Sequence, residues 1–121
     1  MIAVSAKEEW EYVLEVDRGT DKPTVFRLKQ LTLRARIEAE DILKGGAKGM
    51  SFGSFKMRVL KAGLAGWRDL RDASGAEIKP KYAHDGSIGD ESMARIPTDA
   101  MAEIAWEVFN QSSISETERK N

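Results

Sequence analysis

The alternation of hydrophobic and polar residues near the start of the chain predicts two β-strands. In Trp10–Val16 every even position is apolar and Glu occupies two of the odd ones, a period of two that is typical of a strand with one buried face. The alternation resumes in Thr24–Lys29, where Phe26 and Leu28 would point inward. The residues between the two segments, which include Gly19, favour turns. The pattern therefore predicts an N-terminal β-hairpin with a long loop.

Three later segments have apolar residues at spacings of three and four, which is typical of amphipathic helices. The first is expected over residues 32–44, with Thr32 as its N-cap, and the second over about residues 51–64. The third is expected to begin at Thr98, and a capping box at Ser113–Glu116 predicts one last short turn. The predicted fold class is therefore α+β, with the hairpin packed on about three α-helices.

A chain of 121 residues fits one domain, and it is long enough to bury a core without disulfides or metals. It has no cysteine, which excludes disulfides, thiolate nucleophiles and cysteine-ligated zinc. We expect a single domain over residues 1–121. Within it, residues 1–8 and 116–121 are expected to be frayed, and the polar, glycine-bearing segment 79–95 to be a mobile loop.

Charge is segregated along the chain although the net charge is only −1. Residues 27–71 hold eleven Lys and Arg against four Asp and Glu, whereas the segments on either side are acidic. One interpretation is that the basic segment attracts an acidic partner. The other is that the acidic and basic segments neutralise each other in the folded domain.

We expect no secretion signal in the first residues, because no basic stretch precedes a sustained apolar run. The longest apolar stretches are interrupted by Lys61 or Glu107, well short of the roughly 20 apolar residues that span a bilayer. We therefore expect a cytosolic protein that does not insert into membranes.

The residues that commonly carry catalysis are present without the motifs that catalysis needs. The single histidine, His84, has only its neighbour Asp85 as an orienting partner, and no nucleophile motif accompanies them. The glycines around Lys48 do not match a phosphate-binding loop, because Lys48 precedes Gly49 and the segment follows a helix. We therefore expect no enzymatic activity, no cofactor and no metal site.

Nucleic-acid binding is also disfavoured. The basic segment matches no known DNA- or RNA-binding signature, and its aromatic residues Phe52 and Phe55 lie on an apolar helix face rather than among basic residues.

The remaining functional signal is a set of aromatic residues near helix ends and edges. Trp67 stands beside charged residues where the second helix is expected to stop, and Trp106 and Phe109 widen the apolar stripe of the third. Aromatic residues placed in this way can anchor a partner protein. The alternative is that all three complete the domain's own core.

The segment Leu60–Ile78 resembles the tail assembly chaperones of long-tailed bacteriophages. In that family a helix ends at a tryptophan, here Trp67, and an acidic turn with glycine leads into a short apolar segment. The Ile96-Pro97 step before the last helix and the polar end 113–121 are also similar to the family. So is the strand pair that opens the chain.

This resemblance implies a non-catalytic function in the host cytoplasm. Members of the family bind the tape-measure protein, keep it soluble while tail-tube protein subunits are recruited, and are absent from the mature virion. Self-association is a further possibility. The alternatives are a structural head–tail connector or minor tail protein, and a nucleic-acid-binding regulator that uses the basic segment.

Overall fold

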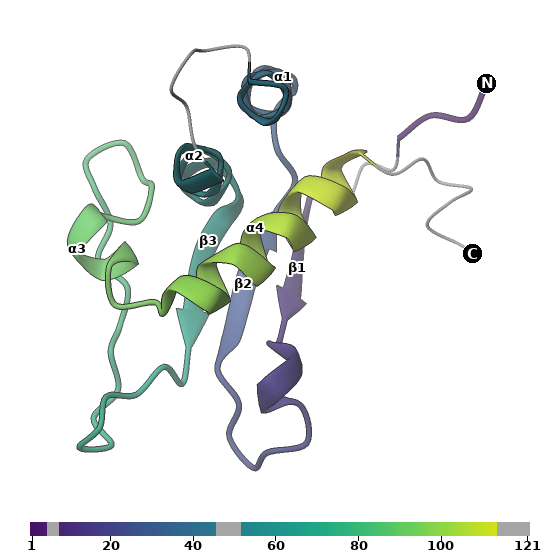
Figure 1. Cartoon of the computed structure of the whole chain (residues 1–121). Helices are drawn as coiled ribbons and strands as arrows, with labels where there is room; N and C mark the ends of the chain where they lie inside the picture. Colours follow the sequence, from purple (N-terminus) through teal and green to yellow (C-terminus); the bar gives the residue numbers. More distant parts are fainter. Residues whose placement is uncertain (5–7, 46–51, 114–121) are drawn as a thin grey trace.

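The computed structural model describes residues 1–4, 8–45 and 52–113, and it has an α+β fold (Figure 1). A three-stranded antiparallel sheet carries its helices on one side, with α4 running across the sheet and α1 and α2 seen nearly end-on (Figure 1). The elements in chain order are β1 (Glu9–Tyr12), the 3-10 turn η1 (Glu15–Asp17), β2 (Val25–Lys29), α1 (Leu33–Leu43), α2 (Phe52–Gly63), β3 (Leu64–Arg68), α3 (Asp90–Met93) and α4 (Thr98–Ser113).

The N-terminal hairpin is confirmed. β1 pairs with β2 so that Trp10 lies opposite Leu28 and Tyr12 opposite Phe26. Phe26 and Leu28 are buried, as their alternation predicted, because they point to the face that the helices cover. The inward alternation does not continue to Val16, whose side chain is 83% exposed because the chain leaves the sheet after Tyr12 and turns through η1.

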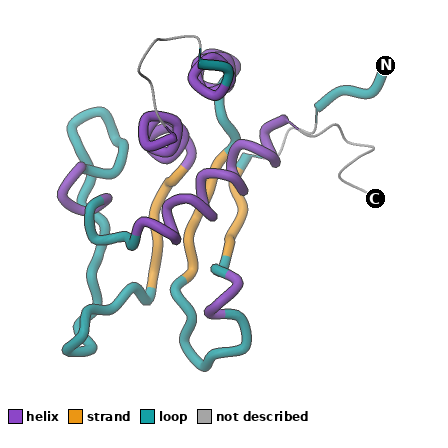
Figure 2. The backbone as a smooth tube through the Cα atoms, viewed as in Figure 1, coloured by secondary structure: helices purple, strands orange, loops and turns teal. Residues whose placement is uncertain are grey.

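The third strand was not predicted from the sequence. The second helix was expected to reach about Leu64 and to be followed by a loop from Arg68, but α2 ends at Gly63 and the chain continues directly into β3 (Figure 2). β3 pairs with the inner strand β2, with Trp67 opposite Phe26 and Leu64 opposite Leu28. The register shifts by one residue at this pairing. The shift lets both side chains face the core although they are three residues apart.

Helices α1, α2 and α4 supply the second layer. Thr32 caps α1 as expected, because its hydroxyl accepts a hydrogen bond from the backbone N–H of Ala35. Helix α2 packs against both other helices, and α4 packs against α2. The core they share with the sheet is built from large buried side chains: Phe26, Leu28, Phe55, Val59, Leu60, Leu64, Ile104 and Val108.

Part of the segment 79–95, which was expected to be a mobile loop, packs against the domain, whereas residues 81–86 are exposed. Tyr82 and Ile88 form an isolated antiparallel bridge, and the one-turn helix α3 follows. Ile88 and Met93 are both buried in the core. The last short turn expected at 113–116 and the expected frayed end 116–121 lie outside the described residues, apart from Ser113 at the end of α4.

The outer face of the sheet is charged, and two of its bases hold ion pairs. Arg27 on β2 forms an ion pair with Glu9 on β1, and Arg68 on β3 forms one with Glu11 on β1. The acids of the first segment of the chain therefore lie against bases of the middle segment, which is the neutralisation that the second interpretation of the charge pattern expected.

Candidate functional site

Four aromatic residues from α2 and α4 form one cluster, which we call the aromatic cluster: Phe52, Phe55, Trp106 and Phe109. Residues three apart on a helix share a face, so Phe52 and Phe55 meet Trp106 and Phe109 across the interface between the two helices. The ring centroids of Phe55 and Trp106 are 5.0 Å apart, and those of Phe52 and Trp106 are 5.7 Å apart in a stacked arrangement. Phe109 meets Phe55 edge-on at 5.2 Å.

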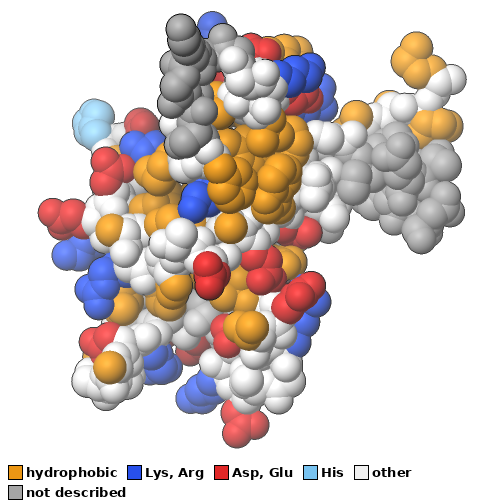
Figure 3. Space-filling view, in the orientation of Figure 1, with side chains coloured by type: hydrophobic (Ala, Val, Ile, Leu, Met, Phe, Trp, Pro, Cys, Tyr) orange, Lys and Arg blue, Asp and Glu red, His pale blue; other side chains and the backbone are white. Residues whose placement is uncertain are grey.

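The aromatic cluster is only partly covered by the protein itself. Within the cluster Phe55 is fully buried, whereas Phe52 is 42% exposed and Trp106 is 38% exposed. Figure 3 shows hydrophobic side chains gathered into a broad patch on this face of the molecule, over the region where α1, α2 and α4 meet. Large aromatic rings that remain exposed in such a patch are typical of a surface that another protein covers.

Basic and acidic side chains border the aromatic cluster on the side of α1 and α2. The ammonium of Lys56 lies 5.3 Å from the centre of the Phe52 ring, a cation–π contact. Arg58 on α2 forms an ion pair with Glu38 on α1. The patch is therefore an apolar centre with a charged rim, which is the usual composition of a protein-binding surface.

The opposite flank of α4 is fixed to the sheet by two carboxylates. Glu103 accepts hydrogen bonds from the Tyr12 hydroxyl at 2.6 Å and from the backbone N–H of Glu15 at 3.0 Å. Glu107 accepts one from the indole N–H of Trp10 at 3.0 Å. Burial, and then the hydrogen bond to Glu103, raise the pKa of Tyr12 well above its ordinary value, so its hydroxyl stays a donor. These contacts set the rotation of α4 that presents Trp106 towards α2.

Of the three residues that the sequence suggested as a binding surface, the structure brings Trp106 and Phe109 together and places Trp67 elsewhere. Trp67 is 8% exposed and lies edge-on to Phe26 at 6.4 Å. Its indole N–H donates to the carbonyl of Ile78 at 2.8 Å. This ring therefore belongs to the core between the sheet and the loop after β3, and it contributes no surface to the aromatic cluster.

Phe52 is the member of the surface that the sequence did not single out. It was assigned to the apolar face of the second helix together with Phe55. In the structure it is the first residue of α2. The sequence signal that could have found it is this position at the start of the predicted helix, where an aromatic residue has fewer helical neighbours than one in the middle.

The residues considered for catalysis do not meet in a reactive arrangement. His84 is exposed, and the carboxylate of Asp85 accepts from the backbone N–H and the hydroxyl of Ser87 rather than from the histidine. These hydrogen bonds lower the pKa of Asp85 below its usual value. Within the described ranges no three His, Asp or Glu side chains are grouped as a metal site would require. Of the segment around Lys48, Gly46, Lys48 and Gly49 lie outside the described residues.

Comparison of the chain with models of protein families, with curated protein sequences and with solved structures gave no match. Across the described residues, every helix is too short or too polar to cross a membrane.

Proposed function

We propose that this protein is a non-catalytic tail assembly chaperone of a long-tailed bacteriophage. In this role it binds the tape-measure protein in the host cytoplasm, helps to recruit tail-tube subunits, and is left out of the mature virion. The observation that carries the proposal is the exposed aromatic cluster on α2 and α4. The resemblance of Leu60–Ile78 to the chaperone family supplies the identity of the client.

The geometry suits a helical client. A tape-measure helix that is not yet enclosed by a tail tube exposes apolar stripes along one side, and such stripes are recognised by grooves between amphipathic helices. Phe52 and Trp106 stack face to face across the interface of α2 and α4, so they offer a rigid apolar platform at that point. Rigid aromatic rings lose little side-chain entropy on binding, which favours them as anchors.

The test is co-purification of the tape-measure protein with single-residue variants of this chain. Trp106→Ala and Phe52→Ala each remove an exposed ring of the aromatic cluster, and each should reduce recovery of the client at least tenfold. The matched control is Tyr82→Ala, because Tyr82 is a half-exposed aromatic residue that contacts β3 instead, through a hydrogen bond from its hydroxyl to the carbonyl of Ala65. This control should retain the client.

Circular dichroism and thermal melting of each variant separate binding from folding. Two variants are used because both rings also contact the buried Phe55, Trp106 at 5.0 Å and Phe52 at 5.7 Å between ring centroids, so either substitution alone could act through folding. Full recovery of the client with a folded Phe52→Ala and a folded Trp106→Ala would refute the proposed surface. Finding the protein in purified virions would favour the alternative of a head–tail connector or minor tail protein.

A further inference from the structure

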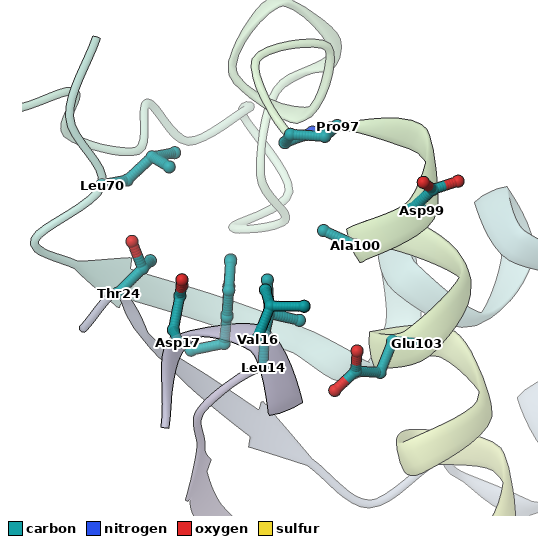
Figure 4. Close-up of a pocket in the computed structure, with 10 residues that line it drawn as sticks. Leu14, Val16, Asp17, Thr24, Leu70, Pro97, Asp99, Ala100 and Glu103 are labelled. Atoms are coloured by element: carbon teal, nitrogen blue, oxygen red, sulfur yellow. The ribbon is translucent and has the colours of Figure 1, made fainter. Parts of the chain in front are cut away.

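A second concave site lies at the end of the molecule where α4 begins. A cleft of about 350 Å³ is lined by apolar side chains from the turn after β1, from β2, from the loop after β3 and from α4: Leu14, Val16, Phe26, Leu70 and Ala100. Figure 4 shows Leu14, Val16 and Asp17 on one side, Ala100 and Glu103 of α4 on the other, and Leu70 and Pro97 across the far end. This cleft is formed by the first two turns of α4, whereas the aromatic cluster uses Trp106 and Phe109 further along the helix.

The floor of the cleft is apolar and closed. Phe26 is fully buried at its base, and Ala100 is nearly so. At the entrance stands Val16, the strongly exposed hydrophobic residue that the hairpin pattern had placed inside. The cleft is at the small end of the range of about 300–1,000 Å³ for ligand pockets, so it suits a single long side chain better than a cofactor.

All of the charged residues that line the cleft are acidic: Asp17, Asp99 and Glu103. Glu103 is held in place by the hydrogen bonds that its Oε2 accepts from Tyr12 and Glu15, which leaves its Oε1 free of hydrogen bonds within the described part of the chain. The nearest basic residue in sequence, Arg18, donates to the carbonyl of Val13 and lies over the Tyr12 ring. In the described ranges none of the three carboxylates has an ion pair.

We propose that this cleft binds the side chain of a lysine or arginine presented by a partner polypeptide. Such a side chain has an apolar stem and a cationic head. The stem would lie against Leu14, Leu70 and Ala100, and the head would reach the carboxylates of Asp17 and Glu103. Burial of the stem and charge-assisted hydrogen bonds of the head act together, so neither a purely apolar nor an acidic side chain satisfies the site.

The occupant is a basic side chain of a partner protein, because the three acids give the cleft a negative charge that is complementary to it. The inference does not depend on the proposed chaperone function, since it rests on a different surface.

Nuclear magnetic resonance titration of the full chain tests the proposal with four blocked amino acids. The probes are the N-acetyl amides of lysine, arginine, norleucine and glutamate, of which norleucine has the lysine stem without its charge. The methyl signals of Leu14, Leu70 and Ala100 should shift saturably with the lysine and arginine probes. Binding of norleucine should be at least tenfold weaker, and the glutamate probe should produce no saturable shift.

The variant Asp17→Asn should weaken lysine binding several-fold and leave norleucine binding unchanged. The matched control is Asp21→Asn, which removes an exposed carboxylate of the same loop that does not line the cleft. Glu103→Gln is a second variant, and its amide oxygen can still accept from Tyr12 and Glu15. The binding of the lysine probe should also weaken as salt is raised, because partly exposed charge pairs are screened.

Several results would overturn the inference. Equal affinity for the lysine and norleucine probes would show that the carboxylates of the cleft do not recognise the cationic head. If Asp17→Asn and Asp21→Asn weaken lysine binding equally, the effect comes from the net charge of the molecule and not from a carboxylate in the cleft. If the cleft signals shift with protein concentration in the absence of any probe, the occupant is a second copy of the chain.

Discussion

Ser112 shows how one polar side chain joins distant parts of this core. It is fully buried near the end of α4, and its hydroxyl accepts a hydrogen bond from the backbone N–H of Leu31 at 2.9 Å. Its carbonyl accepts a second one from the guanidinium of Arg36 at 3.0 Å. The connection between β2 and α1 is thereby attached to the last turn of α4. Neither partner is near Ser112 in sequence, so the sequence pattern did not identify this serine as a core residue.

The variant Ser112→Ala should lower the free energy of unfolding by about 1–3 kcal/mol, because it leaves the N–H of Leu31 buried without an acceptor. Urea denaturation monitored by tryptophan fluorescence measures the change. The matched control is Ser113→Ala, at the adjacent exposed position, where the hydroxyl donates to the carbonyl of Phe109 within the same helix. That variant should stay within about 0.5 kcal/mol of the parent protein. Equal losses for the two serines would contradict the assigned role of Ser112.

At the scale of helices, α2 and α4 approach each other closely at Gly63. A Cβ added at Gly63 would stand 2.4 Å from Cγ1 of Val108 on α4, far closer than two carbon atoms can pack. The glycine thus lets the C-terminal end of α2 lie directly against α4 before the chain enters β3. The same approach brings the aromatic residues of the two helices together at the other end of α2.

We expect Gly63→Ala to destabilise the protein by about 1–3 kcal/mol through overpacking. In a Val108→Ala background the two contacts with Val108 are gone and a contact of 3.3 Å with the backbone carbonyl oxygen of Lys29 remains, so the same change should cost clearly less than in the parent protein. A double-mutant cycle measured by urea denaturation gives the coupling between the two positions. If Gly63→Ala costs the same in both backgrounds, contact with Val108 is not the reason for the glycine.

The sequence predicted those elements whose periodicity is local, and it missed the short helix α3 and the strand β3, which depends on a distant partner. The hairpin, α1 with its Thr32 cap, and the positions of α2 and α4 all follow from spacings within one segment. β3 has five residues, one of them Gly66, and its inward residues Leu64 and Trp67 are three apart. That spacing is typical of a helix. In a strand it is possible here because the register against β2 shifts between the two residues.

The same reason explains why the candidate surface was only partly predicted. Trp106 and Phe109 lie on one helix and could be named from its wide apolar stripe. Trp67 was named with them, but it is buried by its pairing with β2, which the sequence does not reveal. Phe52 was missed because its exposure depends on where α2 begins, and helix boundaries are the least certain part of a prediction from sequence.

At the scale of the whole molecule, folding pairs the charges that the sequence keeps apart. Arg27 and Arg68 face Glu9 and Glu11 across the outer face of the sheet, and Lys61 of α2 faces Asp90 of α3. Each exposed pair contributes little to stability, about 0–1 kcal/mol. The larger consequence is for binding, because the pairing of Arg27 and Arg68 weakens the basic field that the outer face of the sheet presents to a polyanion.

This balance predicts how the protein behaves on heparin, which stands in for nucleic acid. The parent chain should elute early, and the double variant Glu9→Gln/Glu11→Gln should be retained to a higher salt concentration, because Arg27 and Arg68 then lose their partners. A control with the same change in net charge is Glu40→Gln/Asp41→Asn on α1, where these acids hold no ion pair within the described residues. The elution of this control should shift less, since its substitutions leave the ion pairs of Arg27 and Arg68 intact. Equal shifts would mean that net charge alone governs retention, whereas strong salt-sensitive retention of the parent chain would favour the nucleic-acid-binding alternative over the chaperone.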